Sequence, residues 1–257
     1  METAARTSSI SVFFPAFNDE QSIAALISEA MALLPELTDE YEVIVVNDGS
    51  QDRTGQLLNE LLTTTPRLTV IHHRVNRGYG AALRSGFGAA TKDLVFYTDG
   101  DGQYDVRELA ILFKNLEDRV DVANGYKISR SDSSSRVVLG AIYSRVARFF
   151  FRLPIRDVDC DFRLIRRRAL DRIELTSSSG VVCAELVRKL KTAGCVFTEV
   201  PVHHYPRRYG QSQFFTIPRV ARTVLDLGIL WLRLVVRPRL LPASSRRRRV
   251  PVETSGE

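Results

Sequence analysis

The chain has 257 residues, 44% of them apolar, which is enough to bury a sizeable core in one α/β domain with a smaller appendage. It contains no uncharged apolar run of about 18 residues, so the sequence predicts no transmembrane helix. The polar start at residues 1–9 is predicted to be flexible and lacks the features of a signal peptide. Three cysteines without metal-ligand spacing fit reduced thiols, so we expect a cytoplasmic protein.

Positive charge gathers in the last quarter of the chain. The net charge is +6, but residues 201–257 alone hold 11 arginines against 3 acidic residues, a net of +8. Such a segment attracts phosphates, anionic lipids or nucleic acids. It has no platform of aromatic and basic residues and no known nucleic-acid motif, so we expect no nucleic-acid partner.

Strands and helices alternate through the first hundred residues. Apolar runs predict buried strands at 10–14, 41–46, 68–71 and 94–98. Amphipathic or alanine-rich stretches between them predict helices at 23–34, 52–62 and 80–90. This alternation favours a doubly wound, mostly parallel sheet with helices on both faces.

The second half is less regular. The elements predicted there are a strand at 121–125, a polar loop at 127–136, helices at 137–151 and 181–192, and a strand at 197–202. The serine-rich part of the loop, residues 129–136, could close over a ligand as mobile lids do. Glu185 lies on the second of these helices.

Polar residues and glycines follow three of the first four predicted strands, at 15–18, 47–50 and 99–103. The carboxyl ends of parallel strands share one edge of the sheet, where ligands bind. Asp99 and Asp101 are two residues apart and therefore point the same way. Two such carboxylates could hold Mg²⁺ or Mn²⁺ together with phosphate oxygens. Taken alone, the segment fits an ordinary surface turn equally well.

Six short motifs occur in order between about residues 10 and 213. They are PAFNDE at 15–20, VNDGSQDRT at 46–54, NRGYGAA at 76–82, DGDGQ at 99–103, DFRL at 161–164 and RRYGQS at 207–212. In this order they resemble the family 2 glycosyltransferases of GT-A fold, and among these the polyprenyl-phosphate (dolichyl-phosphate) hexose transferases. The resemblance implies a glycosyltransferase domain over 10–213.

The resemblance implies an inverting transfer of a hexose from a donor of the GDP-mannose or UDP-glucose type to a polyprenyl phosphate. The residues implied to bind the nucleotide sugar are Pro15, Ala16, Asn18, Glu20, Asp48, Gly80, Asp99, Asp101 and Gln103. Of these, Asp99, Asp101 and Gln103 would hold the metal ion. A divalent cation suits this chemistry, because negative charge develops on the leaving diphosphate.

The resemblance also assigns residues to catalysis and to the acceptor. The catalytic residues would be Asp101, Asp161 and Arg163, and those binding the acceptor phosphate would be Lys127, Arg136, Ser144, Arg207 and Ser212. Relatives often carry glycine at the position of Asp161 and lysine at that of Gln213. A lipid phosphate is already anionic, so it needs positioning more than a general base. Glu185 would lie near the acceptor or have a structural role.

Residues 214–240 form the predicted C-terminal appendage. Their charges fall on one helical stripe at Arg219, Arg222, Asp226, Arg233 and Arg237, and apolar residues with Trp231 cover the rest. This pattern favours a helix lying on a membrane surface through 218–239, which makes the protein peripheral at the cytoplasmic face. The helix could instead dock on its own domain or join two copies in a homodimer. Residues 241–257 are predicted to be a disordered basic tail.

Two other functions remain open from the sequence. The acceptor could be a saccharide or a small metabolite, or the chain could bind sugar nucleotides without catalysis. The glycines at 78 and 80 follow the third strand rather than the first and lack a third partner, which argues against a nicotinamide-binding loop.

Overall fold

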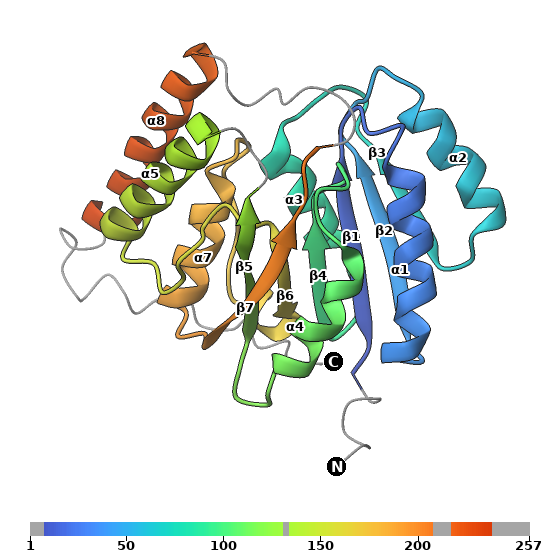
Figure 1. Cartoon of the computed structure of the whole chain (residues 1–257). Helices are drawn as coiled ribbons and strands as arrows, with labels where there is room; N and C mark the ends of the chain where they lie inside the picture. The colour runs from blue at the N-terminus through green and yellow to red at the C-terminus, as the bar shows by residue number, and fades with distance from the viewer. Residues whose placement is uncertain (1–7, 131–133, 208–216, 238–257) are drawn as a thin grey trace, which may run out of the picture.

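A seven-stranded sheet forms the centre of the computed structural model, which describes residues 8–130, 134–207 and 217–237 (Figure 1). The strands are β1 (Ile10–Ala16), β2 (Tyr41–Asn47), β3 (Leu68–His72), β4 (Leu94–Thr98), β5 (Val122–Arg130), β6 (Phe162–Arg166) and β7 (Phe197–His204). Their order across the sheet is β3-β2-β1-β4-β6-β5-β7. All neighbouring pairs are parallel except those that β6 makes with β4 and β5.

Helices cover both faces of this sheet. Their bounds are α1 (Ile23–Leu37), α2 (Thr54–Thr64), α3 (Tyr79–Ala89), α4 (Leu109–Asn115), α5 (Ser134–Phe151), α6 (Arg167–Leu170), α7 (Val182–Thr192) and α8 (Ile217–Trp231). A 3₁₀ turn at Val106–Glu108 precedes α4, and a π-helical turn at Leu232–Val236 continues α8. The expectation of a doubly wound, mostly parallel sheet with helices on both faces is confirmed.

Alternate residues of β1 enter two separate cores. Val12 and Phe14 pack with α1, α2 and α4 on one face, whereas Phe13 packs with α3 and α7 on the other. Successive side chains of a strand point to opposite faces, so a strand covered on both sides must be apolar throughout. This is why the central strands stand out in the sequence as unbroken apolar runs.

The predicted loop at 127–136 is wrong in extent. Strand β5 continues to Arg130 because it stays paired with β7 up to His204, with a register irregularity between Lys127 and Ser129. Helix α5 then begins at Ser134. Residues 131–133 lie outside the described residues, so the closing motion expected of 129–136 stays a prediction.

A third, smaller core holds the C-terminal helix. Leu230 and Val235 are each 3% exposed and pack with apolar residues of α5 and α7. One face of α8 therefore docks on the chain's own domain, as one of the sequence alternatives expected. Among the described residues no helix is both long and apolar enough to cross a membrane. The tail at 241–257 lies outside the described residues.

Candidate active site at the ends of the parallel strands

The turns that follow β1, β2 and β4 meet at one edge of the sheet. The Asp48 N–H donates to the Ala16 carbonyl oxygen (2.9 Å), and the Gly100 N–H donates to the Pro15 carbonyl oxygen (3.2 Å). A Cβ on Gly100 would lie 2.8 Å from that same Pro15 oxygen, so a side chain there would push the two turns apart. The structure thus brings the three predicted strand-end motifs together.

Asn18 and Glu20 fasten the first of these turns to the second. Asn18 adopts a left-handed backbone (φ 58°), and its Oδ1 accepts from the Gln51 N–H (2.8 Å). The Glu20 carboxylate accepts from the Arg53 N–H (2.9 Å). Both side chains therefore hold the turn after β1 against the segment after β2. Their contact with a nucleotide stays a prediction.

The carboxylate of Asp48 is buried and holds the loop that leads into α3. It accepts from the backbone N–H groups of Arg77 and Gly78, each at 2.9 Å, and lies 2.5 Å from Nδ1 of His73. The other ring nitrogen of His73 contacts the Ser85 hydroxyl at 2.9 Å. The Asp48 carboxylate thus makes three hydrogen bonds with protein groups, and the nucleobase contact expected for it stays a prediction.

Asp99 and Asp101 lie directly after β4. The Tyr79 hydroxyl donates to Asp99 (2.6 Å), and Asp101 accepts from the Gln103 N–H (3.1 Å). Burial, followed by the nearby carboxylates of Asp161 and Asp101, raises the pKa of Asp99 well above its ordinary value. A cation placed among these carboxylates would relieve their repulsion, which fits a divalent metal.

The described residues do not provide a complete metal site by themselves. No three His, Cys, Asp or Glu side chains within them converge in a way that could hold a metal ion. The amide nitrogen of Gln103 donates to the Tyr205 carbonyl oxygen (3.0 Å), which leaves its oxygen as the only side-chain atom suited to a cation. A metal at Asp99 and Asp101 would therefore need further oxygens from the ligand, as the sequence led us to expect.

Arg163, which the resemblance assigns to catalysis, lies in the interior of the protein. It is fully buried in β6, and its guanidinium donates to Asn124 Oδ1 (2.5 Å), Val158 O (2.6 Å) and Asp161 Oδ1 (2.8 Å). Strand alternation accounts for this burial, since the neighbouring Phe162 and Leu164 point into the opposite core. The catalytic role of Arg163 stays a prediction.

Asp161 links this buried arginine to the other carboxylates. Its carboxylate accepts from Arg163 and from the hydroxyl of Tyr97 (3.3 Å), and the Cys183 thiol lies 3.1 Å away. The side chain of Asp161 is itself only 12% exposed. In this arrangement Asp161 holds Arg163 and Tyr97, and its direct contact with a substrate stays a prediction.

Of the residues predicted to bind the acceptor phosphate, the structure describes the side chains of Lys127, Ser144 and Arg207. Lys127 donates to the Asp159 carbonyl oxygen (2.9 Å), and Arg207 pairs with Asp101 (2.9 Å). Ser144 is buried on α5, and its hydroxyl has no hydrogen-bond partner among the described residues. The side chain of Arg136 and the whole of Ser212 lie outside what the structure describes.

Sequence reasoning missed Asp19 and Tyr79, although both lie inside the quoted motifs. Asp19 accepts from the Phe17 N–H (2.9 Å), and burial raises its pKa to about 7 with a smaller contribution from Asp101. Tyr79 holds Asp99, as described above. The available signal was their place inside PAFNDE and NRGYGAA.

Several known proteins are similar to this chain. The chain is 27% identical over 85% of its length to undecaprenyl-phosphate 4-deoxy-4-formamido-L-arabinose transferases of Yersinia pestis and Yersinia pseudotuberculosis, and spans 66% of their length. A solved structure of glucosyl-3-phosphoglycerate synthase from Mycobacterium tuberculosis, with Mn²⁺ and UDP-glucose, is also similar. The match has a TM-score of 0.67 at 18% identity and covers 89% of this chain and 80% of that one.

A second solved structure supports the same fold. The mannosyltransferase PcManGT from Pyrobaculum calidifontis, in complex with GDP-mannose and Mn²⁺, has a TM-score of 0.61 at 23% identity. The match covers 88% of this chain and 64% of that one. The model of one family, described as "Glycosyl transferase family 2", matches residues 11–174, which include the turns after β1, β2 and β4. This chain therefore belongs to glycosyl transferase family 2.

Proposed function

We propose that this chain transfers a sugar, most simply a hexose, from a nucleotide sugar to a polyprenyl phosphate with the help of Mg²⁺ or Mn²⁺. The observation that carries the proposal is the pair Asp99 and Asp101 at the edge where β1, β2 and β4 end. The Yersinia relatives are named for an undecaprenyl-phosphate acceptor. The solved neighbours hold UDP-glucose or GDP-mannose with Mn²⁺.

On the donor side, Asp99 and Asp101 would hold the metal, with the Gln103 oxygen beside them. The bound ion would stabilise the negative charge that develops on the leaving nucleoside diphosphate. Arg207 adds a second positive charge at this place, because its guanidinium lies 2.9 Å from Asp101. The Asp48 carboxylate supports the donor site indirectly by holding the backbone of Arg77 and Gly78.

On the acceptor side, the reaction is proposed to be a direct, inverting displacement. An oxygen of the lipid phosphate forms the bond to the anomeric carbon as the bond to the nucleoside diphosphate breaks, and the bonding electron pair leaves with the diphosphate. The acceptor oxygen carries its own negative charge, so positioning dominates over proton removal. Lys127, Ser144 and Arg207 are proposed to provide that positioning, with Arg136 and Ser212 as further candidates.

A membrane surface is the proposed source of the acceptor. Exposed apolar side chains line α5, α8 and the start of the turn after α8, and we call them the α5–α8 surface: Ile142, Val146, Phe149, Phe150, Val224, Leu225, Ile229 and Leu232. The two helices lie side by side (Figure 1), and the indole nitrogen of Trp231 donates to the Phe150 carbonyl oxygen (3.1 Å). Exposed apolar side chains gathered on neighbouring helices mark an interaction site.

Charge favours an anionic bilayer as the occupant. The exposed charged residues of the described parts of α5 and α8 and of the turn after α8 are all arginines, namely Arg145, Arg148, Arg222, Arg233 and Arg237. Asp226, which is only partly exposed, already accepts from the Ser179 hydroxyl (2.7 Å). Apolar side chains beside cations suit the boundary between headgroups and acyl chains. We therefore propose peripheral association at the cytoplasmic face, with a homodimer contact as the competing use of this surface.

A panel of radiolabelled donors tests the proposed reaction. GDP-mannose, UDP-glucose, UDP-GlcNAc and a nucleotide-linked 4-deoxy-4-formamido-L-arabinose would each be incubated with polyprenyl phosphate and Mg²⁺ or Mn²⁺. We expect one donor to move its label into the organic phase, and EDTA or Asp101→Asn to abolish the transfer. Label transferred only to a water-soluble saccharide or phosphoglycerate would identify the other acceptor class. Nucleotide binding without any transfer would identify a non-catalytic binding protein.

A further inference from the structure

Glu185 is a buried carboxylate that the proposed reaction does not use. It lies in the first turn of α7 and accepts from the backbone N–H of Thr176 (3.0 Å), the hydroxyl of Thr176 (2.8 Å) and the N–H of Ser177 (2.8 Å). It thereby fixes residues 176–179, a stretch with neither helix nor strand that we call the serine segment. Buried carboxylates with this many donors are held firmly in one place.

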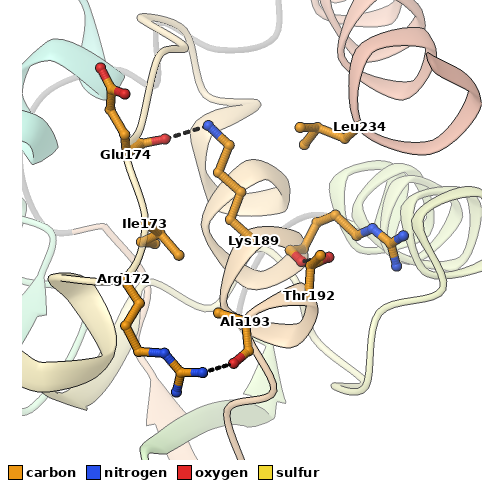
Figure 2. A pocket seen from close by; sticks show the side chains of 8 residues that line it. Arg172, Ile173, Glu174, Lys189, Thr192, Ala193 and Leu234 are labelled. Atoms are coloured by element: carbon orange, nitrogen blue, oxygen red, sulfur yellow. Dashed lines mark hydrogen bonds between the residues drawn. The ribbon is translucent and has the colours of Figure 1, made fainter. Parts of the chain in front are cut away.

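Lys189 completes the environment of this carboxylate. Its ammonium lies 2.6 Å from Glu185 and also donates to the Glu174 carbonyl oxygen, and Figure 2 shows this second contact in the pocket lined by Arg172 and Leu234. Burial alone raises the pKa of Glu185, but the hydrogen bonds from Lys189, Ser177 and Thr176 outweigh it and lower the pKa to about 2. Glu185 is therefore ionised at neutral pH.

The serine segment contacts the loop that leads into α3 and the first turns of α3. The Ser178 carbonyl oxygen accepts from the Gly80 N–H (2.9 Å), and the Ser177 carbonyl oxygen accepts from the Arg84 guanidinium. A Cβ on Gly78 would lie 2.5 Å from the Ser178 oxygen, so the two backbones are in direct contact. The position of this loop thus depends on the position of the segment behind it.

Tyr79 follows this loop as the first residue of α3, and its hydroxyl reaches the proposed metal site. Its hydroxyl donates to Asp99, while the residues just before it are held by Asp48. A shift of the serine segment would therefore move Tyr79 relative to Asp99. Helix α8 and the turn after it contact the same segment, because Ser179 donates to Asp226 of α8 (2.7 Å) and Arg233 of the turn donates to Thr176 (3.4 Å).

We propose that Glu185 is a positioning residue for the donor site, which holds the serine segment so that Tyr79 stays against Asp99 and thereby sets the affinity for the nucleotide. This inference deepens the proposed function and rests on it for the identity of the donor. The contact itself, from Glu185 through Ser177 and Ser178 to Gly80, can be tested without any reaction.

Amide hydrogen exchange of the unliganded chain tests this contact. In Glu185→Gln one or more of the N–H bonds to the carboxylate is lost, so we expect amides at 78–84 to exchange about tenfold faster than in the wild type. The matched control is Glu174→Gln, which makes the same chemical change at an exposed residue of the same connection. If Glu185→Gln does not fold, Thr176→Val removes a single bond to Glu185 and should give a smaller increase at the same amides. Unchanged exchange at 78–84, or an increase confined to α7, would overturn the proposal.

Nucleotide binding then tests whether Glu185 acts through Tyr79. The dissociation constants of GDP and UDP would be measured with Mn²⁺ for Glu185→Gln, Tyr79→Phe and the double variant. We expect each single change to weaken binding of one nucleotide about tenfold, and the double variant to bind no more weakly than the weaker single one. If the double variant weakened nucleotide binding by the product of the two single effects, Glu185 would not act through Tyr79, which would contradict the proposal. A wild type that binds neither nucleotide would count against the proposed function, while the exchange data would still decide whether Glu185 holds the loop.

Discussion

Arg207 Nη2 lies 2.9 Å from Asp101 Oδ2, which ties the chain after β7 to the acidic turn after β4. The two side chains are 26% and 13% exposed, so solvent and salt screen this ion pair less than one on the open surface. The guanidinium therefore competes with any cation for the Asp101 carboxylate. It also provides positive charge for an anion that binds beside Asp101.

Replacing Arg207 should move metal affinity and activity in opposite directions. In Arg207→Ala the positive charge next to Asp101 disappears, so we expect Mn²⁺ to bind more tightly to the nucleotide-free protein. Sugar transfer should fall at least about tenfold, because the leaving diphosphate loses a cation. Calorimetric titration with Mn²⁺ and initial rates of transfer measure the two effects. Arg207→Lys keeps the charge and should resemble the wild type in Mn²⁺ affinity; weaker Mn²⁺ binding in Arg207→Ala would contradict this role.

Two glycines of α3 provide a matched pair of substitutions. A Cβ on Gly80 would collide with the Ser177 carbonyl oxygen, whereas a Cβ on Gly88 meets nothing within 4 Å. We expect Gly80→Ala to lower the melting temperature and weaken nucleotide binding, because the backbone at Tyr79 must move. Gly88→Ala should stabilise the protein by up to about 1 kcal/mol, since alanine favours the helix over glycine. Thermal unfolding of both variants checks this. Equal melting temperatures would show that the backbone at Gly80 and Ser177 can move apart without a loss of stability, which would contradict the prediction.

The parts of the fold that could be predicted are those governed by local pattern. Strands β1, β2 and β4 are apolar on both faces, and each is followed by residues that favour turns. Their sequences therefore predict both that a strand forms and where it ends. The meeting of Asp48, Asp99 and the Pro15 turn at one edge then follows from parallel topology.

The parts that could not be predicted depend on distant partners. Strand β6 contains Arg163, whose charge interrupts the apolar pattern and is satisfied by Asn124 and Tyr97 from two other strands. The same holds for Glu185, because its position on a helix gives no sign that it binds the serine segment. Buried polar groups are recognisable only when their partners are known, since a lone charge in a sequence equally well faces solvent.

The stability contributed by Glu185 should vanish in acid. Its pKa of about 2 in the folded chain lies below the ordinary value of 4.5, so its bonds stabilise the fold fully above pH 4.5 and lose their effect as pH falls to about 2. A shift of this size corresponds to at most about 3 kcal/mol. Urea unfolding at pH 7, 5, 4 and 3 should show the gap between wild type and Glu185→Gln shrinking steadily below pH 4.5. Glu174→Gln should show no such convergence, and a gap independent of pH would rule out the ionised carboxylate as its source.

The α5–α8 surface should carry membrane binding through both of its helices. Phe149 on α5 is 79% exposed and Leu225 on α8 is 67% exposed, so neither side chain is needed for the core. Changing either to glutamate removes an inserting apolar group and adds a charge that anionic headgroups repel. We expect Phe149→Glu and Leu225→Glu each to reduce sedimentation with phosphatidylglycerol vesicles about tenfold or more, with unchanged melting temperatures.

The matched control is Leu62→Glu, because Leu62 is 39% exposed on α2, at the other end of the sheet from α5 and α8 (Figure 1). It should bind vesicles like the wild type. Added salt should weaken the binding of the wild type to vesicles, because it screens the attraction of Arg145, Arg148 and Arg233 to the headgroups. The binding that remains at high salt should depend on the apolar residues. If instead the two substitutions leave vesicle binding intact and convert a dimer into a monomer in solution, the surface joins two copies of the chain. The acceptor would then have to reach Lys127 and Arg207 by another path.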